Sequence, residues 1–316
     1  MFFVIALFLY FSSFHNNSSN LSRFKRINYS SDVSGQNGLV VSASKYATQV
    51  GIDILKKGGN AVDAAVGVAF ALSVTFPQAG NIGGGGFMVI KTKDTVTSID
   101  FREKAPSASS PGMFLDKDSN FVPEKSQFGY LSAGVPGSVA GLLYALDKYG
   151  KLSRDSIMNP AIDLAENGFE IEPRFAESLN SRKKEFSKFE SSKKVFTKSK
   201  GGFSSGEKFI QKDLANTLKL IKDKGRDGFY TGKVAGLIED EMKKGGGLIT
   251  KQDLANYYPV ERKVVSGNYK GYDIYSVAPP SSGGVALISL LNILEYDRVP
   301  DLNDAAAMAD YYHVLI

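Results

Sequence analysis

Hydrophobic and polar side chains alternate most clearly in a short stretch near residue 95. An apolar run at residues 87–90 is followed by a polar turn at residues 92–94 and by an alternating run that ends near residue 102. Two strand-like segments around a short polar turn predict a β-hairpin. Because successive side chains of a strand point to opposite faces, the second segment should have one apolar and one more polar face. The apolar face would carry Thr97, Ile99 and Phe101, and the more polar face Val96, Ser98, Asp100 and Arg102.

Other stretches repeat apolar residues every three or four positions, which is typical of amphipathic helices. Helices are predicted at residues 44–57, 60–74, 136–149, 153–167, 212–225, 228–244 and 285–294. The second of these is apolar nearly all round and should therefore be buried. Pro136 suits the first turn of its helix, and Thr250 with Asp253 forms a capping-box pattern. Further strands are predicted at residues 39–43, 263–269 and 272–277.

Two glycine-rich segments invite a ligand-binding interpretation. The glycines at residues 83–86 lack the Lys-Ser/Thr pair or the completed G-x-G-x-x-G spacing of a phosphate loop, and they lead into a strand instead of a helix. We therefore expect them to allow close packing of sheet against helix. The Ser-Ser-Gly-Gly segment at residues 281–284 opens a predicted helix. Ordinary capping by Ser282 is favoured there over an anion site made of free backbone amides.

Arg102 leaves the end of the second hairpin strand just before Pro106 stops the strand. Its planar, permanently charged guanidinium is suited to holding a carboxylate at two points. The alternative is a surface ion pair with Asp100 or Glu103, and from spacing alone this alternative is favoured because most such arginines are solvated or paired. We assign no catalytic role to the two carboxylates.

Composition excludes several classes of site. The 316 residues are 43% hydrophobic and 22% charged, which suits one large globular domain or two. The net charge of +5 comes largely from lysines at residues 183–200, 212–224 and 243–244, which are spread over predicted helices and loops, whereas a nucleic-acid groove needs its charge gathered on one face. There is no cysteine, so a disulfide, a thiolate metal site and a cysteine nucleophile are excluded. The two histidines, His15 and His313, lie at opposite ends, which disfavours a Ser-His-Asp triad or a multi-histidine metal site.

The first residues predict an export signal followed by a linker. Residues 1–14 are an apolar run too short to span a bilayer comfortably, and we expect a signal peptide in preference to a membrane anchor or to a hydrophobic arm packed on the domain. Residues 15–37 are polar and rich in serine and asparagine, as in linkers. Residues 38–316 then form the globular region.

A family resemblance changes the weight given to Arg102. It rests on five words that occur in this order: GNIGGGGFM, DFREKAP, GVPGSVAG, LITKQDLA and PPSSGG. Over residues 38–295 the chain resembles the large-subunit portion of γ-glutamyltranspeptidases (glutathione hydrolases), which are N-terminal nucleophile hydrolases. The resemblance implies an α+β fold, the four-layer αββα sandwich of that superfamily, of which residues 38–316 supply an incomplete, large-subunit part.

The resemblance also implies a mechanism. Such enzymes are made as a precursor that cuts itself before a threonine, whose amine and hydroxyl then serve as base and nucleophile and form a γ-glutamyl ester. The arginine of the DFRE word, here Arg102, would hold the substrate α-carboxylate. The nucleophile belongs to a Thr-Thr-His-type word, and this chain contains no Thr-Thr pair. We therefore expect no catalytic residue in this chain, which looks truncated before the nucleophile threonine and inactive when alone.

The implied partners are glutathione and other γ-glutamyl compounds, amino-acid or peptide acceptors, and a small subunit cut from the same precursor. No cofactor, metal or nucleic acid is expected, and the location would be periplasmic or extracellular. Two alternatives remain open. One is a related acylase that acts on another amide, such as a cephalosporin side chain or poly-γ-glutamate. The other is a noncatalytic fragment or pseudoenzyme that binds a partner through an open sheet edge.

Overall fold

A computed structural model describes residues 33–296, 300–301 and 303–313 of the chain. The chain divides into two compact units, Met1–Leu39 and Val40–Ile316, and every element below belongs to the second. The predicted signal peptide at residues 1–14 and most of the predicted linker lie outside the described residues. Within the described part, no helix is long and apolar enough to cross a membrane.

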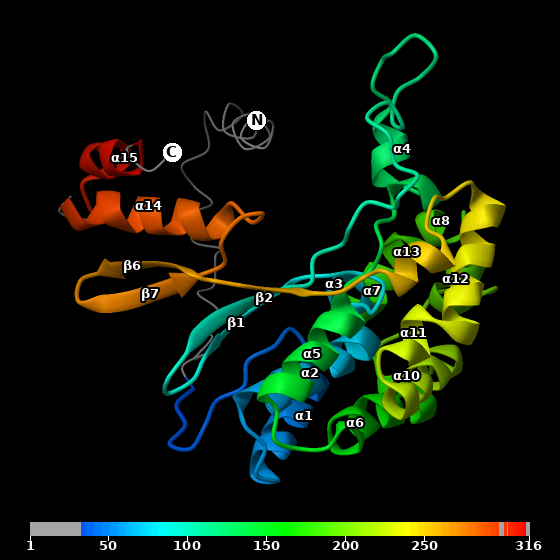
Figure 1. Cartoon of the computed structure of the whole chain (residues 1–316), viewed down its shortest axis with the longest axis horizontal. Coiled ribbons are helices and arrows are strands. Elements are labelled where there is room, and N and C mark those ends of the chain that lie inside the picture. The colour runs from blue at the N-terminus through cyan, green and yellow to red at the C-terminus, as the bar shows by residue number, and fades with distance from the viewer. Residues whose placement is uncertain (1–32, 297–299, 302, 314–316) are drawn as a thin grey trace, which may run out of the picture. The chain divides into compact units, whose positions relative to one another are not determined.

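The helical core is built around α2 (Ala61–Thr75), which α1 (Lys45–Lys56), α5 (Ser138–Tyr149) and α6 (Arg154–Asn167) contact (Figure 1). The expectation that α2 is buried is confirmed, because its apolar side chains are hidden almost all round. Asn60 and Asp63 form a capping box at its start. The buried Asp63 carboxylate also accepts hydrogen bonds from the backbone amides of Lys151 and Leu152, at 2.9 and 3.2 Å, and so ties the α5–α6 connection to α2.

The predicted hairpin forms the main sheet. Strands β1 (Phe87–Lys91) and β2 (Val96–Asp100) pair antiparallel, with Met88 opposite Ile99, and β5 (Val260–Arg262) joins the other edge of β2. Ser98 and Asp100, which lie on the face of β2 predicted to be more polar, are buried. The reason is β5: the Arg262 carbonyl accepts a hydrogen bond from the Ser98 hydroxyl, and the Arg262 guanidinium pairs with Asp100.

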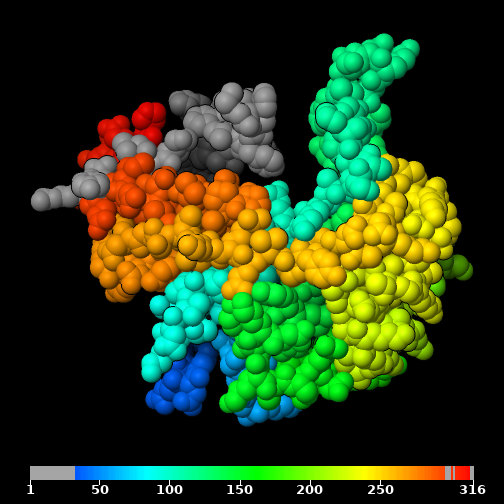
Figure 2. Space-filling model, in the orientation of Figure 1, coloured from blue at the N-terminus to red at the C-terminus, as the bar shows by residue number. Residues whose placement is uncertain are grey.

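Three smaller groups of elements complete the unit. Strands β3 (Phe169–Glu170) and β4 (Lys208–Phe209) pair antiparallel. The hairpin of β6 (Val265–Tyr269) and β7 (Tyr272–Ser276) carries α14 (Gly283–Tyr296) against it. The remaining helices are α3 (Pro77–Gly80), α4 (Pro123–Gln127), the 3-10 helix η2 (Tyr130–Ser132), α7 (Pro173–Ser181), α8 (Lys183–Phe186), α9 (Glu190–Phe196), α10 (Lys212–Lys224), α11 (Asp227–Tyr230), α12 (Gly232–Gly245), α13 (Lys251–Ala255) and α15 (Ala305–His313). The segment that carries α4 projects as a narrow column (Figure 2).

Most predicted elements are confirmed, and three differ. Residues 39–43 form no strand, because no described segment pairs with them. Pro136 lies before α5 instead of in its first turn, since the helix begins at Ser138. The helix predicted at residues 228–244 is broken into α11 and α12 at Gly232, whose φ of 61° departs from helical geometry. The Thr250–Asp253 capping box is present as predicted.

Candidate functional site

Arg102 is exposed and lies two residues beyond the end of β2, at the wall of a cavity of about 480 Å³. The lining of this cavity includes Arg102, Glu103, Lys104, Met113, Phe114 and Ser132. Among the residues that the structure describes, the Arg102 guanidinium joins no ion pair. The alternative predicted from spacing, an ion pair with Asp100 or Glu103, is therefore not formed. Asp100 pairs instead with Arg262, whose Nε lies 2.9 Å from Asp100 Oδ2.

The backbone of Arg102 is held by side chains at both of its polar groups. Its amide donates to Asp100 Oδ1 at 3.1 Å, and its carbonyl accepts a hydrogen bond from the Tyr257 hydroxyl at 2.8 Å. Asp100 thus fixes the Arg102 main chain with one oxygen and the Arg262 guanidinium with the other. These hydrogen bonds fix the peptide groups on either side of the Arg102 Cα, while the Arg102 guanidinium stays available to a ligand.

Two glycines allow this backbone to lie deep between its neighbours. A Cβ on Gly85 would lie 2.6 Å from the Phe101 carbonyl oxygen, and a Cβ on Gly137 would lie 2.0 Å from the same atom. The Gly84 carbonyl accepts hydrogen bonds from the amides of Gly137 and Ser138, at 2.8 and 3.0 Å. The glycine run therefore packs the sheet end against the start of α5, as the sequence predicted, and it encloses the segment that carries Arg102.

The other cation of the cavity is already engaged. Lys104 Nζ donates to the Tyr258 carbonyl at 3.0 Å and lies 4.8 Å from the centre of the Tyr257 ring. Arg102, whose guanidinium makes no ion pair among the described residues, is the more available of the two cations for an anionic group. A planar guanidinium at the wall of a cavity can bind a carboxylate through two parallel N–H···O hydrogen bonds.

A smaller cavity of about 230 Å³ lies along the glycine loop, and Glu103 lines both it and the Arg102 cavity. Its walls are mostly apolar and include Leu72, Ile82, Phe101 and Leu142. This arrangement places an apolar recess beside the arginine. Glu103 is exposed and, among the described residues, makes no ion pair with Arg102.

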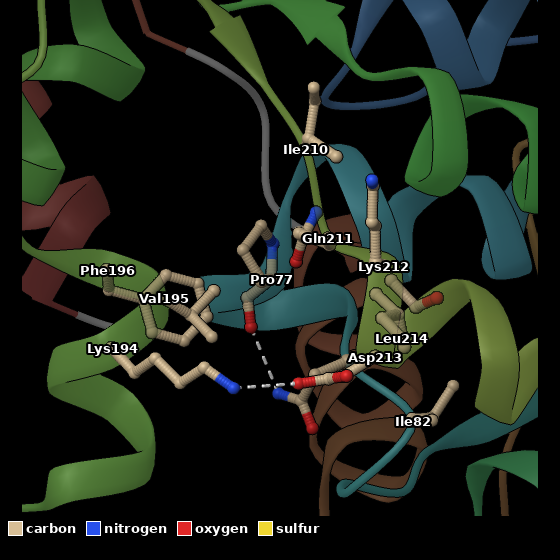
Figure 3. Close-up of a pocket in the computed structure, with 12 residues that line it drawn as sticks. Pro77, Ile82, Lys194, Val195, Phe196, Ile210, Gln211, Lys212, Asp213 and Leu214 are labelled. Atoms are coloured by element: carbon tan, nitrogen blue, oxygen red, sulfur yellow. Dashed lines mark hydrogen bonds and ion pairs between the residues drawn. The ribbon is translucent and has the colours of Figure 1, made fainter.

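A third and larger cavity, of about 610 Å³, lies between α9 and the start of α10 (Figure 3). Lys194 and Asp213 form an ion pair of 3.4 Å within it, and Phe196 and Ile210 contribute apolar surface. Its lining does not include Arg102. Lys212 also lines this cavity, so its lining carries two lysines and one aspartate.

Within residues 33–296, 300–301 and 303–313, no group of three or more His, Asp or Glu side chains could hold a metal ion. His313 ends α15, and His15 lies outside the described residues. The hydroxyl of Ser281 accepts a hydrogen bond from the Gly283 amide at 3.3 Å, a local contact within the Ser-Ser-Gly-Gly segment.

The sequence located Arg102 but not Tyr257 or Gly137. Tyr257 follows α13 in an irregular segment, where no periodic pattern marks a buried side chain, and it lies far from Arg102 along the chain. Gly137 belongs to the GVPGSVAG word, but nothing in that word alone says which atoms it must approach.

The sequence of the chain is similar to those of known proteins. A family model described as gamma-glutamyltranspeptidase matches residues 47–316. The glutathione hydrolase proenzyme of Escherichia coli (strain K12) is 49% identical over 265 residues, which cover 83% of this chain and 46% of that protein. The corresponding proenzyme of Pseudomonas sp. (strain A14) is 46% identical over 284 residues, covering 89% and 49%. The chain therefore spans about half the length of these curated relatives.

The chain is also similar to solved structures. The crystal structure of Helicobacter pylori gamma-glutamyltranspeptidase matches with a TM-score of 0.87 and 47% identity, covering 90% of this chain and 82% of that one. The cephalosporin acylase from Bacillus halodurans matches with a TM-score of 0.72 and 28% identity, covering 92% and 56%.

Proposed function

The chain belongs to the γ-glutamyltranspeptidase family, and we propose that it is the part of a γ-glutamyl hydrolase and transferase that recognises the donor. One observation carries the proposal: Arg102 stands at a cavity wall with its backbone anchored and its guanidinium outside every ion pair of the described residues. We assign to it the α-carboxylate of glutathione or of another γ-glutamyl compound. An oriented arginine–carboxylate pair would fix the γ-amide relative to the nucleophile.

The chemistry of the proposed reaction requires a threonine from the other half of the enzyme. Its hydroxyl attacks the γ-carbonyl carbon while its own amine takes the hydroxyl proton, and the leaving amine departs with a proton. Water or the amine of an amino-acid or peptide acceptor then attacks the ester and restores the hydroxyl. In this scheme no side chain of the present sequence is bonded to the reacting carbon, and Arg102 acts by binding and orientation.

The organisation of the chain follows from the same proposal. We propose residues 38–316 as a large-subunit region, residues 15–37 as a polar linker and residues 1–14 as an export signal. Export would place the protein in the periplasm or outside the cell. The partner would be the small subunit of the same precursor.

An acylase reaction on another amide is the second candidate, and the structural likeness to the cephalosporin acylase from Bacillus halodurans supports it. The glutathione hydrolases of Escherichia coli and Pseudomonas are far more similar in sequence, at 49% and 46% identity against 28%. We therefore place γ-glutamyl donors first.

The test supplies the missing half. A chimaera that joins residues 38–316 to the C-terminal half of the Escherichia coli relative is expected to cut itself and to release p-nitroaniline from γ-glutamyl-p-nitroanilide. The 316-residue chain alone should release none above a buffer blank, because it contains no Thr-Thr word. A self-cleaved chimaera that hydrolysed a cephalosporin side chain and ignored both the anilide and glutathione would favour the acylase. Turnover of the anilide by the 316-residue chain alone would contradict the proposed division of roles.

A further inference from the structure

Tyr257 is almost completely buried, with 1% of its surface exposed, and its hydroxyl reaches the carbonyl of Arg102 at 2.8 Å. Its own main chain is fixed on both sides. The Tyr257 amide donates to the Leu254 carbonyl at 3.1 Å, and the Tyr257 carbonyl accepts a hydrogen bond from Arg226 Nη2 at 2.7 Å. These hydrogen bonds therefore fix the main chain from which the Tyr257 hydroxyl extends.

The ring of Tyr257 is held as firmly as its backbone. It stacks on Tyr230 with 5.8 Å between ring centres and 9° between ring planes, and Lys104 Nζ lies 4.8 Å from its centre. Tyr230 in turn donates its hydroxyl hydrogen to the Pro136 carbonyl at 2.8 Å and accepts a hydrogen bond from the Ala140 amide at 3.2 Å. The two stacked tyrosines thus contact different targets: Tyr230 holds the start of α5, and Tyr257 holds Arg102.

Glycine at position 137 leaves room for the Tyr257 hydroxyl. A Cβ at position 137 would lie 2.2 Å from the Tyr257 oxygen, so only glycine at that position permits the contact. Burial raises the pKa of Tyr257 above the ordinary value of a tyrosine, with the charges of neighbouring acidic groups acting in the same direction. The hydroxyl consequently stays protonated and remains a hydrogen-bond donor at neutral and mildly alkaline pH.

We propose that Tyr257 is a positioning residue for donor recognition, which fixes the Arg102 peptide so that the guanidinium meets the donor carboxylate in one orientation. This inference rests on the proposed function of Arg102. Without the Tyr257 hydroxyl, the Arg102 carbonyl loses its hydrogen-bond partner, and the peptide that follows Arg102 gains freedom to rotate. Because the Arg102 side chain is long, a small rotation of the backbone displaces its guanidinium by a larger distance. A displacement of about 1 Å at a binding group can cost as much as 100-fold in rate.

The experiment compares Tyr257→Phe with Tyr230→Phe, a matched control, in the self-cleaved chimaera. Both changes remove one buried hydroxyl from the same stack, but only the first touches Arg102. Two donors are used: γ-glutamyl-p-nitroanilide, and 4-aminobutyryl-p-nitroanilide, which keeps the amine and lacks the α-carboxylate. Tyr257→Phe should lower kcat/KM for the first donor about 10-fold, mainly through a higher KM. Tyr257→Phe should change kcat/KM for the second donor less than about 2-fold. Tyr230→Phe should change kcat/KM for both donors by the same factor.

Arg102→Ala in the same chimaera distinguishes failure of the positioning role of Tyr257 from failure of the proposed function of Arg102. If Arg102→Ala penalises the γ-glutamyl donor selectively and Tyr257→Phe affects both donors equally or neither, the positioning role is wrong and the proposed function stands. If Arg102→Ala is itself unselective, the proposed function fails and the inference fails with it.

A second measurement needs no turnover. Amide hydrogen exchange in the 316-residue chain should quicken by about 10-fold at residues 101–104 in Tyr257→Phe, because a lost hydrogen bond of this kind corresponds to a factor of that size. Exchange at residues 61–75 in α2 should stay unchanged. Unaltered exchange at residues 101–104 would overturn the positioning role even if the variant chimaera failed to mature.

Discussion

Gly137 shows how a missing side chain fixes the geometry around Arg102. Its amide donates to the Gly84 carbonyl, and its Cα faces the Phe101 carbonyl and the Tyr257 hydroxyl so closely that no other residue fits. Because the nearest atom is backbone, the obstacle cannot be relieved by rotating a side chain.

Gly137→Ala is therefore expected to destabilise the 316-residue chain by about 2–3 kcal/mol, the cost of forcing a methyl group into a packed interior. Gly236→Ala is the matched control. Position 236 lies within α12, and a Cβ there would meet nothing within 4 Å, so the change should stabilise the chain by about 0.5–1 kcal/mol. Urea titrations of both variants measure the free energy of unfolding, and similar effects of the two changes would show that the contact at Gly137 is not tight.

At the scale of elements, helices were predicted best because their signals are local. Apolar periodicity located α1, α2, α6 and α10 closely, and the capping box at Thr250 was visible as a sequence pattern. Strand environments depend on residues far along the chain. The polar face predicted for β2 is covered by Arg262, and the strand predicted at residues 39–43 has no partner among the described elements.

The same distinction applies to the candidate site. The DFREKAP word located Arg102, whereas the residues that fix it come from β5, from the start of α5 and from the segment after α13. Their contacts arise only when the chain folds. Neither periodicity nor spacing could have indicated them.

Glu261 joins three elements through one carboxylate. It accepts hydrogen bonds from Tyr144 at 2.8 Å, from Tyr149 at 2.5 Å and from Thr97 at 2.9 Å, and it also pairs with Lys148. The Lys148 ammonium, together with the tyrosine hydroxyls, lowers the pKa of Glu261 to about 2. The carboxylate therefore ties β5 to β2 and α5.

This lowered pKa predicts an acid-dependent contribution to stability. An unfolded glutamate has a pKa of about 4.3, so the stabilisation is fully present above that pH and is lost as the pH falls toward 2, the pKa in the folded chain. Glu261→Gln should cost about 1–3 kcal/mol at pH 6, as for hydrogen bonds to a charged group, and much less at pH 2.5.

The control is Glu172→Gln, which removes the exposed ion pair with Lys45 and should change stability by about 0.5 kcal/mol or less. Denaturant titrations at the two pH values give the comparison. An equal penalty for Glu261→Gln at pH 6 and pH 2.5 would mean that the carboxylate charge is not what holds the three elements together.

At the scale of the whole molecule, the α+β fold of N-terminal nucleophile hydrolases expected from the sequence is confirmed by the likeness to solved γ-glutamyltranspeptidases. Within the described residues the sheet order is β1-β2-β5, and apolar side chains of α14 such as Val285 and Leu287 are exposed. A second half of the enzyme would add the nucleophile to Arg102, whose backbone is already anchored here and which we propose as the residue that recognises the donor. We thus propose a division of roles in the enzyme, with donor recognition on this chain.

The most direct measurement of that claim is the donor selectivity of Arg102→Ala in the self-cleaved chimaera. Loss of the partner of a desolvated carboxylate costs about 2–5 kcal/mol, so kcat/KM for γ-glutamyl-p-nitroanilide should fall about 30- to several-thousand-fold. For 4-aminobutyryl-p-nitroanilide, which offers no α-carboxylate, it should change only slightly. Arg102→Lys should recover part of the loss, because it keeps the charge without the planar fork. Self-cleavage should persist in both variants, since it needs no free donor. Equal losses for the two donors, or a kcat/KM within a few-fold of the parent, would contradict the account and leave Arg102 a structural residue.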